Sequence, residues 1–163
     1  MIYMSERRIP HCRRRDKKLT KPQHFLFYAL EYLMLFVLGG FIYYMIEICF
    51  RGYSHPSMFI LGGICFILIG LINEVLPWDM LFWWQLLIGD IIVLVLEFVT
   101  GCIVNLYLGW NIWDYSDMPF NLMGQICLPF ALLWLPVIAV AIVLDDYCKY
   151  LFFHGEKPHY RFK

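Results

Sequence analysis

Charged residues are scarce in this sequence, and nearly all of its basic residues lie at the two ends. Asp, Glu, Lys and Arg make up 16% of the 163 residues, whereas an average soluble domain has about 25%. Arg51 is the only Lys or Arg between Lys21 and Lys149. The long middle of the chain is therefore too poor in charge for an ordinary soluble domain, and we expect no nucleic-acid partner.

The sequence also lacks the short motifs that carry common chemistry. It has no G-x-x-x-x-G-K-[ST], with which a P-loop holds ATP, and no H-E-x-x-H or G-x-S-x-G. Its six cysteines stand singly, without C-x-x-C pairs or metal-ligand spacing. We therefore expect no enzyme activity, no cofactor, no metal and no disulfide framework. A membrane-embedded enzyme is the minor alternative: Gly89–Asp90 resembles one aspartate motif of intramembrane aspartyl proteases, but the second motif is missing.

Hydrophobic residues are abundant instead, and they fall into four blocks. They make up 61% of the chain, and each block approaches or exceeds the roughly 20 residues that cross a bilayer as a helix. Backbone groups in lipid must be satisfied within the segment, which favours helices over open strands. The sequence predicts an all-α polytopic membrane protein with helices at about 25–50, 57–76, 80–108 and 123–147. Residues 24–148 would form the four-helix membrane domain, between a basic tail at 1–23 and a second tail at 149–163.

The distribution of basic residues predicts the orientation of these helices. Eight Lys or Arg residues precede the first block and four follow the last, and positive residues mark the cytoplasmic side. Both termini are therefore expected to be cytoplasmic. The loops at 51–56 and 109–121 would face outward, and the turn at 77–79 would face inward. The first block is too long for a cleaved signal peptide, and no small-x-small cleavage site follows it.

Polar residues recur along one face of the third block. Asp90 and Glu97 are seven residues apart, and Thr100 or Gly101 and then Asn105 continue the same face. A carboxylate near the bilayer centre costs about 2.5 kcal/mol or more. The stripe could line a path for an ion, a proton or a polar substrate, or it could be a packing interface with hydrogen-bonded acids. The candidate partners in such an interface are Tyr43, Tyr44 and Asn73.

Glu47 and Arg51 form a second polar pair, at the end of the first block. Glu four residues before Arg is the favourable order for a pair on one helix face. One interpretation is a local interfacial pair of little energetic weight. The other is that Arg51 anchors an acidic residue of the 109–121 loop, such as Asp114.

That loop leads into the most distinctive stretch of the chain, GWNIWDYSDMPFNLMGQICL at 109–128. Its WDYSDMPFNLMGQICL, followed by PFALLW, resembles a bacterial family known as putative ABC-transporter permeases, type IV. Members typically show W-D-Y-S, then P-x-N, then G-x-I-C-L. EFVTG at 97–101 and EICFR at 47–51 resemble the family's E-x-x-T-G and E-x-x-x-R. The matching loop positions are Trp113, Asp114, Tyr115, Ser116, Pro119, Asn121, Gly124, Ile126, Cys127 and Leu128.

The resemblance implies a multi-pass protein of the bacterial cytoplasmic membrane that works with a separate ATPase subunit. It also has departures: SHPSMFILGG lacks the family's Asn-Arg-Gly run and Gly-Pro, and Gln125 and Pro129 stand near where many members carry a basic residue. Four helices are too few for a full pathway, so we expect an oligomer or a partner protein in the bilayer.

Two hypotheses follow for the function of this chain. The first is a transport-related subunit, and the alternative is a membrane assembly or regulatory protein whose W-D-Y-S loop binds a partner. We expect this loop to be folded, with Asp114 and Asp117 capping a short helix. The candidate functional residues are Glu47, Arg51, Asp90, Glu97, Thr100, Trp113, Asp114, Tyr115, Ser116 and Asn121.

Overall fold

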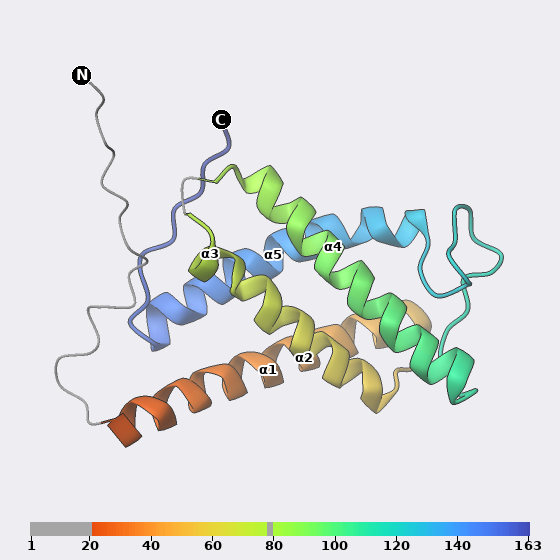
Figure 1. Ribbon diagram of the computed structural model, residues 1–163, viewed down its shortest axis with the longest axis horizontal. Coiled ribbons are helices and arrows are strands. Elements are labelled where there is room, and N and C mark those ends of the chain that lie inside the picture. Colours follow the sequence, from red (N-terminus) through yellow and green to blue (C-terminus); the bar gives the residue numbers. More distant parts are fainter. Residues whose placement is uncertain (1–20, 78–79) are drawn as a thin grey trace.

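Four long helices form the body of the protein, as predicted. The structure is a computed structural model that describes residues 21–77 and 80–163, and this part of the chain contains no β-strand. Four helical segments are long and apolar enough to cross a membrane, and they cross one another in a single bundle (Figure 1). The helical elements are α1 (Lys21–Arg51), α2 (Pro56–Gly70), α3 (Ile72–Val75), α4 (Phe82–Gly101), η1 (Cys102–Tyr107) and α5 (Leu128–Phe152).

The second and third crossings are each built from two helical pieces. α2 passes into α3 at Leu71, and α4 continues as η1, which is a π-helix. A π-helix is a rare departure from the α-helix that often occurs near functional sites. Here η1 carries Asn105, which faces the loop that follows it.

The fourth crossing begins later than predicted, at Leu128 rather than at residue 123. Met123 and Gly124 have φ angles of 53° and 69°. These angles lie in the left-handed region, so α5 cannot extend back through these two residues. Pro129 occupies the first helical turn, where its missing N–H costs nothing. Pro129 therefore lies at the start of α5, whereas Pro136 lies inside the helix. α5 also runs on to Phe152 and so includes Lys149.

Glycines allow α1 and α2 to pack closely against each other. Gly39 on α1 lies under the Phe66 side chain of α2, and Gly62 on α2 lies under the Tyr43 side chain of α1. A Cβ at either glycine would collide with the ring-bearing side chain opposite. Helices in membranes commonly associate through small residues in this way. The contact fixes Tyr43, which belongs to the site described below.

The bundle has two ends that differ in what covers them. The loop end carries residues 52–55 and the long loop 108–127, and the tail end carries the start of α1, the finish of α5 and the C-terminal tail 153–163 (Figure 1). Residues 1–20 of the predicted basic tail lie outside the described residues, as do Trp78 and Asp79 of the predicted inward turn, whereas residues 21–23 already belong to α1. Which end faces the cytoplasm stays a prediction.

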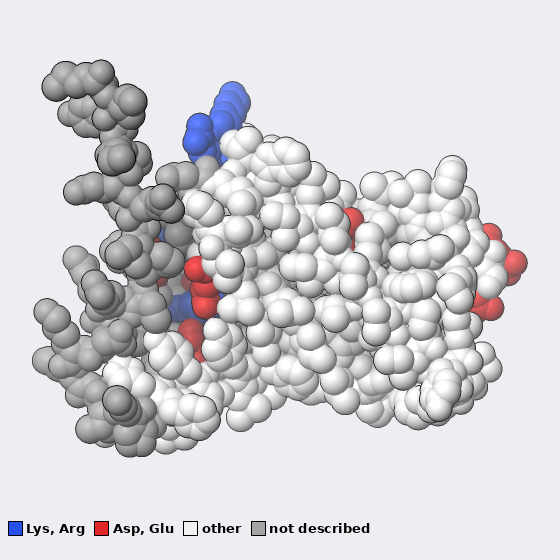
Figure 2. All heavy atoms as spheres, viewed as in Figure 1, with Lys and Arg blue, Asp and Glu red and all other residues white. Residues whose placement is uncertain are grey.

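The outer surface between the two ends is apolar, as a lipid-facing surface must be. Large hydrophobic side chains point outward along all four crossings. On the face drawn in Figure 2, charged atoms gather mainly at the two ends, and the band between them is uncharged except for one small acidic patch. The buried core lies inside this band, and its members include Met58, Leu61, Cys65, Ile69, Ile72, Val93, Ile138 and Ile142. The protein is thus a multi-pass membrane protein.

Candidate functional site

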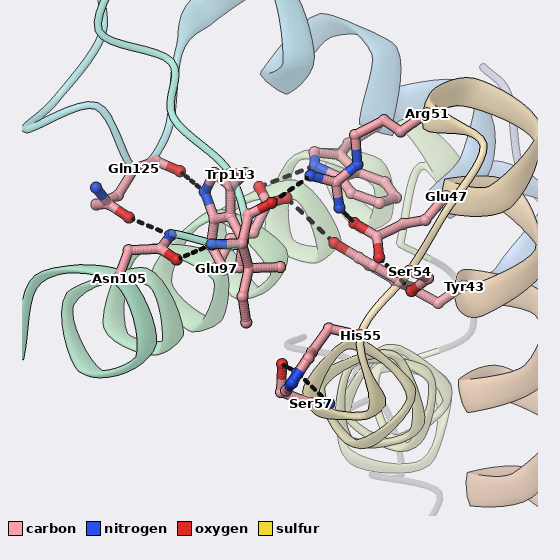
Figure 3. A network of polar contacts seen from close by, with 12 residues as sticks. Tyr43, Glu47, Arg51, Ser54, His55, Ser57, Glu97, Asn105, Trp113 and Gln125 are labelled. Atoms are coloured by element: carbon pink, nitrogen blue, oxygen red, sulfur yellow. Dashed lines mark hydrogen bonds and ion pairs between the residues drawn. The ribbon is translucent and has the colours of Figure 1, made fainter. Parts of the chain in front are cut away.

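Glu97 is buried where three helices meet, and each of its carboxylate oxygens has a partner. It lies on α4 and is 3% exposed. The Tyr43 hydroxyl on α1 donates to Oε1 over 3.2 Å, and the Trp134 indole on α5 donates to Oε2 over 3.0 Å. The Tyr43 and Trp134 rings are stacked, with centroids 5.2 Å apart. Of the partners considered from the sequence, Tyr43 is the one found here (Figure 3).

The predicted polar stripe on the third crossing is only partly assembled. Glu97, Gly101 and Asn105 are buried on the inward face, and Gly101 lies against Gln125 and Trp113. Asp90 and Thr100 are half-buried, and among the described residues no hydrogen bond joins Asp90 to Glu97 or satisfies the buried Asp90 Oδ1. On the inward face the predicted stripe therefore keeps two buried polar side chains, Glu97 and Asn105, with Gly101 between them.

Arg51 links the end of α1 to the long loop. It forms the predicted ion pair with Glu47, which also accepts a hydrogen bond from the Ser54 hydroxyl over 2.5 Å. Arg51 Nη1 donates to the carbonyl oxygen of Ile112 over 3.1 Å. The hypothesis that Arg51 anchors Asp114 needs correction, because Asp114 turns toward Ser116 instead. The loop group that Arg51 binds is the backbone carbonyl of Ile112. A sequence pattern does not indicate which backbone carbonyl a side chain will contact.

The buried half of the long loop is held by η1 and by its own amide groups. The Ile112 N–H donates to Asn105 Oδ1 over 2.7 Å, and Asn105 Nδ2 donates to Gln125 Oε1 over 2.9 Å. The Trp113 indole donates to the Gln125 carbonyl over 2.9 Å. Figure 3 shows these side chains converging from η1 and the loop. Sequence reasoning treated Gln125 as a departure from the family pattern, but it is a central member of this cluster.

The exposed half of the loop is a folded turn rather than a helix start. Asp114 Oδ1 accepts from the Ser116 hydroxyl over 2.5 Å and from the Ser116 N–H over 2.9 Å. These two hydrogen bonds hold the pKa of Asp114 below its usual value. Asn121 Nδ2 donates to the carbonyls of Ser116 and Met118. The loop is folded as expected, but no helix starts at Asp114 or Asp117.

Tyr115 joins the loop to the start of α5. Its ring stacks on Phe130 with centroids 4.6 Å apart, and its N–H donates to the Gly124 carbonyl over 2.8 Å. Burial, followed by the nearby Glu97, raises the pKa of the Tyr115 hydroxyl, which therefore stays protonated at neutral pH. Among the loop positions that carry the family resemblance, Trp113 and Tyr115 are turned into the protein, whereas Asp114, Ser116 and Asn121 are exposed.

A second charged cluster, at the tail end, was not predicted. Lys149 Nζ lies 2.8 Å from Asp145 Oδ2 and 2.5 Å from Glu74 Oε1, and it donates to the Gly70 carbonyl over 3.1 Å. Asp145 is fully buried, and its Oδ1 has no hydrogen-bond partner among the described residues. The spacing of Asp145 and Lys149 by four residues is the signal that could have revealed this pair.

Asp146 extends the same cluster to the C-terminal tail. Asn73 Nδ2 donates to Asp146 Oδ2 over 2.7 Å, and the Tyr160 hydroxyl donates to the same oxygen over 2.9 Å. Burial and the Asp146 carboxylate both raise the pKa of Tyr160, which therefore stays a donor. Asn73 is thus a partner of Asp146 and not of the polar stripe.

Neither the Glu97 cluster, which consists of Glu97, Tyr43 and Trp134, nor the tail-end cluster around Lys149 has the ligand set of a metal centre. Within residues 21–77 and 80–163, no group of three or more His, Cys, Asp or Glu residues is placed to hold a metal ion. The described cysteines are free, and those that line helices do so as small hydrophobes. What the Glu97 cluster can do is bind a polar or charged group, or exchange a proton, at a point shared by α1, α4 and α5.

Comparison with known proteins agrees with the motif resemblance. Residues 34–154 match the family described as "Putative ABC-transporter type IV". No curated protein and no solved structure matches the chain. The matched range begins within α1 and includes the long loop, the Glu97 cluster and all of α5.

Proposed function

Because the chain belongs to the putative ABC-transporter type IV family, we propose that it is a transport-related membrane subunit that works with a separate ATPase. Most of the described chain is membrane helix, the long loop and the C-terminal tail make up most of the rest, and the sequence has no P-loop motif. The energy of ATP would therefore reach it through a partner. Further copies of the chain or other membrane partners would complete the pathway.

The observation that carries this proposal is the position of Glu97. A buried carboxyl inside a membrane bundle is costly and marks a functional position by default. Here its two partners come from two other helices, so a relative movement of α1 or α5 would break one of the two hydrogen bonds. The hydrogen bonds of Glu97 would therefore depend on, or control, how α1, α4 and α5 are arranged.

The long loop supports the same proposal. Through the Ile112 backbone it joins Arg51 on α1 to Asn105 on η1, so the loop, α1 and the third crossing are tied together at one end of the bundle. Such a tie would let the loop follow helix movements during a transport cycle. With both termini cytoplasmic, this loop would lie on the outer side of the bacterial cytoplasmic membrane.

The test is to isolate the tagged chain from its native membrane and identify the proteins that stay bound. Recovery of an ATPase whose hydrolysis rate rises when the chain is present in lipid nanodiscs would support the proposal. Glu97→Gln should lower this stimulation while the complex still forms, and Asp117→Asn, a change of an exposed loop acid, should not. An isolated chain that binds no ATPase, even after crosslinking in the membrane, would contradict it.

One observation favours the alternative of an assembly or regulatory protein. The tip of the long loop is fixed by hydrogen bonds, yet it presents apolar side chains to its surroundings: Phe120 is 83% exposed and Met123 is 60% exposed. Replacement of Phe120 by Ser separates the two functions. Loss of a bound partner with unchanged ATPase stimulation would favour assembly or regulation, and the reverse result would favour transport.

A further inference from the structure

An apolar crevice lies between α1 and α5, beside the Glu97 cluster. Its volume is about 360 Å³, which falls within the range of ligand-binding pockets. The buried residues Cys65 and Ile69 of α2, Val93 of α4 and Ile138 of α5 form its floor. Exposed Val140 and half-buried Ile42 and Ile46 form its rim, so the crevice opens to the side of the bundle.

We propose that this crevice binds a single hydrocarbon chain of a membrane lipid. The lining side chains are almost entirely apolar, and they come from residues inside the four membrane crossings. The medium outside the opening is therefore lipid hydrocarbon rather than water. An empty cavity of this size would forfeit many van der Waals contacts, and a lipid chain can restore them.

The length of the crevice fits this occupant. Along α5 the lining extends from Trp134 to Leu144, which is about 15 Å at 1.5 Å per residue. This length is about half of the roughly 30 Å hydrocarbon core, which is the reach of a lipid chain from one leaflet.

One wall of the crevice is shared with the Glu97 cluster. Tyr43 and Trp134 both line the crevice, and both donate hydrogen bonds to the Glu97 carboxylate. A chain in the crevice would contact these two rings while Glu97 stays behind them. Pro136 also lines the crevice, and it leaves the carbonyl one turn earlier in α5 without its usual N–H donor. The binding of a lipid chain does not require that transport occurs, so the two proposals can fail separately.

The test uses the full-length protein in nanodiscs of phosphatidylcholine with a photoactivatable diazirine in the middle of one acyl chain. After irradiation, peptide mass spectrometry locates the adducts. A chain inside the crevice will mark the buried floor, at Cys65, Val93 or Ile138, in addition to the exposed lipid-facing Val95. Adducts confined to exposed side chains would overturn the proposal, because bulk lipid reaches those alone.

Two variants make the result specific to the crevice. Ala141→Phe fills the space from α5, and Val140→Trp covers the rim from an exposed position and so spares the core. Each should remove the floor adducts and leave the Val95 adducts unchanged, whereas Ala29→Phe, the same change at an exposed position of α1, should alter neither. Floor adducts that persist in a folded Val140→Trp protein would contradict the proposal. Glu97→Gln should retain them, even if it abolishes ATPase stimulation.

Discussion

Arg51 Nη1 lies 3.1 Å from the carbonyl oxygen of Ile112, and this contact ties the end of α1 to the long loop. The same guanidinium pairs with Glu47, so one side chain satisfies a helix acid and a loop carbonyl together. Arg is suited to this because its planar group presents several donors in fixed directions. The loop is therefore attached to the bundle at a defined point and is not a free connection.

Replacing Arg51 should loosen the loop. Arg51→Gln removes the charge that pairs with half-buried Glu47, and leaving a buried polar group without its partner costs about 1–3 kcal/mol. We expect a lower unfolding midpoint in detergent and faster hydrogen exchange at residues 109–116. Arg51→Lys, which retains the charge but not the fixed fork of donors, should show a smaller change. Equal exchange rates in all three proteins would show that the contact is not needed to hold the loop.

Glu97 should tolerate Gln better than Leu. Gln keeps one oxygen that can accept from Tyr43 or Trp134, but its amide nitrogen cannot accept from the other donor. One lost partner should cost about 1–3 kcal/mol, measured as reversible unfolding in detergent, and Glu97→Leu should cost more because both donors lose their acceptor. A Leu variant as stable as the parent would mean that Tyr43 and Trp134 find other partners.

The turn around Ser116 should depend on pH through Asp114. Hydrogen bonds from Ser116 depress the pKa of Asp114 in the folded loop. The stabilisation is therefore present above the unfolded pKa of Asp and is lost as the pH falls through the lower folded value. Amide exchange of Ser116, corrected for the intrinsic effect of pH, should become less protected in acid. Asp114→Asn keeps an acceptor oxygen without titrating, so its protection should stay constant over the same range.

Lys149 should be more sensitive to replacement than an exposed lysine. Lys149→Met leaves the buried Asp145 without its counter-charge, and breaking a buried ion pair costs about 3–5 kcal/mol. The double change Asp145→Asn with Lys149→Met should recover part of this loss, because it removes the uncompensated charge. Lys157→Met, at an exposed position of the tail, is the matched control. If the double variant is no more stable than Lys149→Met alone, the pairing with Asp145 is not the source of the effect.

The sequence was sufficient to predict the helices because lipid imposes a simple rule on them. Blocks of about 20 apolar residues must be helices in a membrane, and the four crossings are found close to where this rule places them. The start of α5 was missed because Met123, Ile126 and Cys127 extend the apolar run toward the loop. Their left-handed and extended backbone angles depend on how the loop packs, which composition does not reveal.

Local spacing predicted one contact of the candidate site, and the polar side chains of other helices suggested a second. Glu47 and Arg51 pair as their four-residue spacing indicates, and Glu97 meets a tyrosine that was among its candidate partners. Contacts such as Gln125 with Asn105, or Lys149 with Glu74, join separate helices and loops. Their geometry depends on tertiary packing, and a single sequence does not determine it.

The C-terminal tail closes the tail end of the bundle with residues that are synthesised after the four crossings. The Arg161 carbonyl accepts from the Phe82 N–H, the first of the unpaired N–H groups at the start of α4, and Tyr160 covers Asp146. Residues 160–161 follow all four crossings in the chain and so leave the ribosome after them. A chain can therefore insert all four helices before this end of the bundle is closed, and a message truncated ahead of Tyr160 would yield an inserted protein with Asp146 and the start of α4 left uncovered.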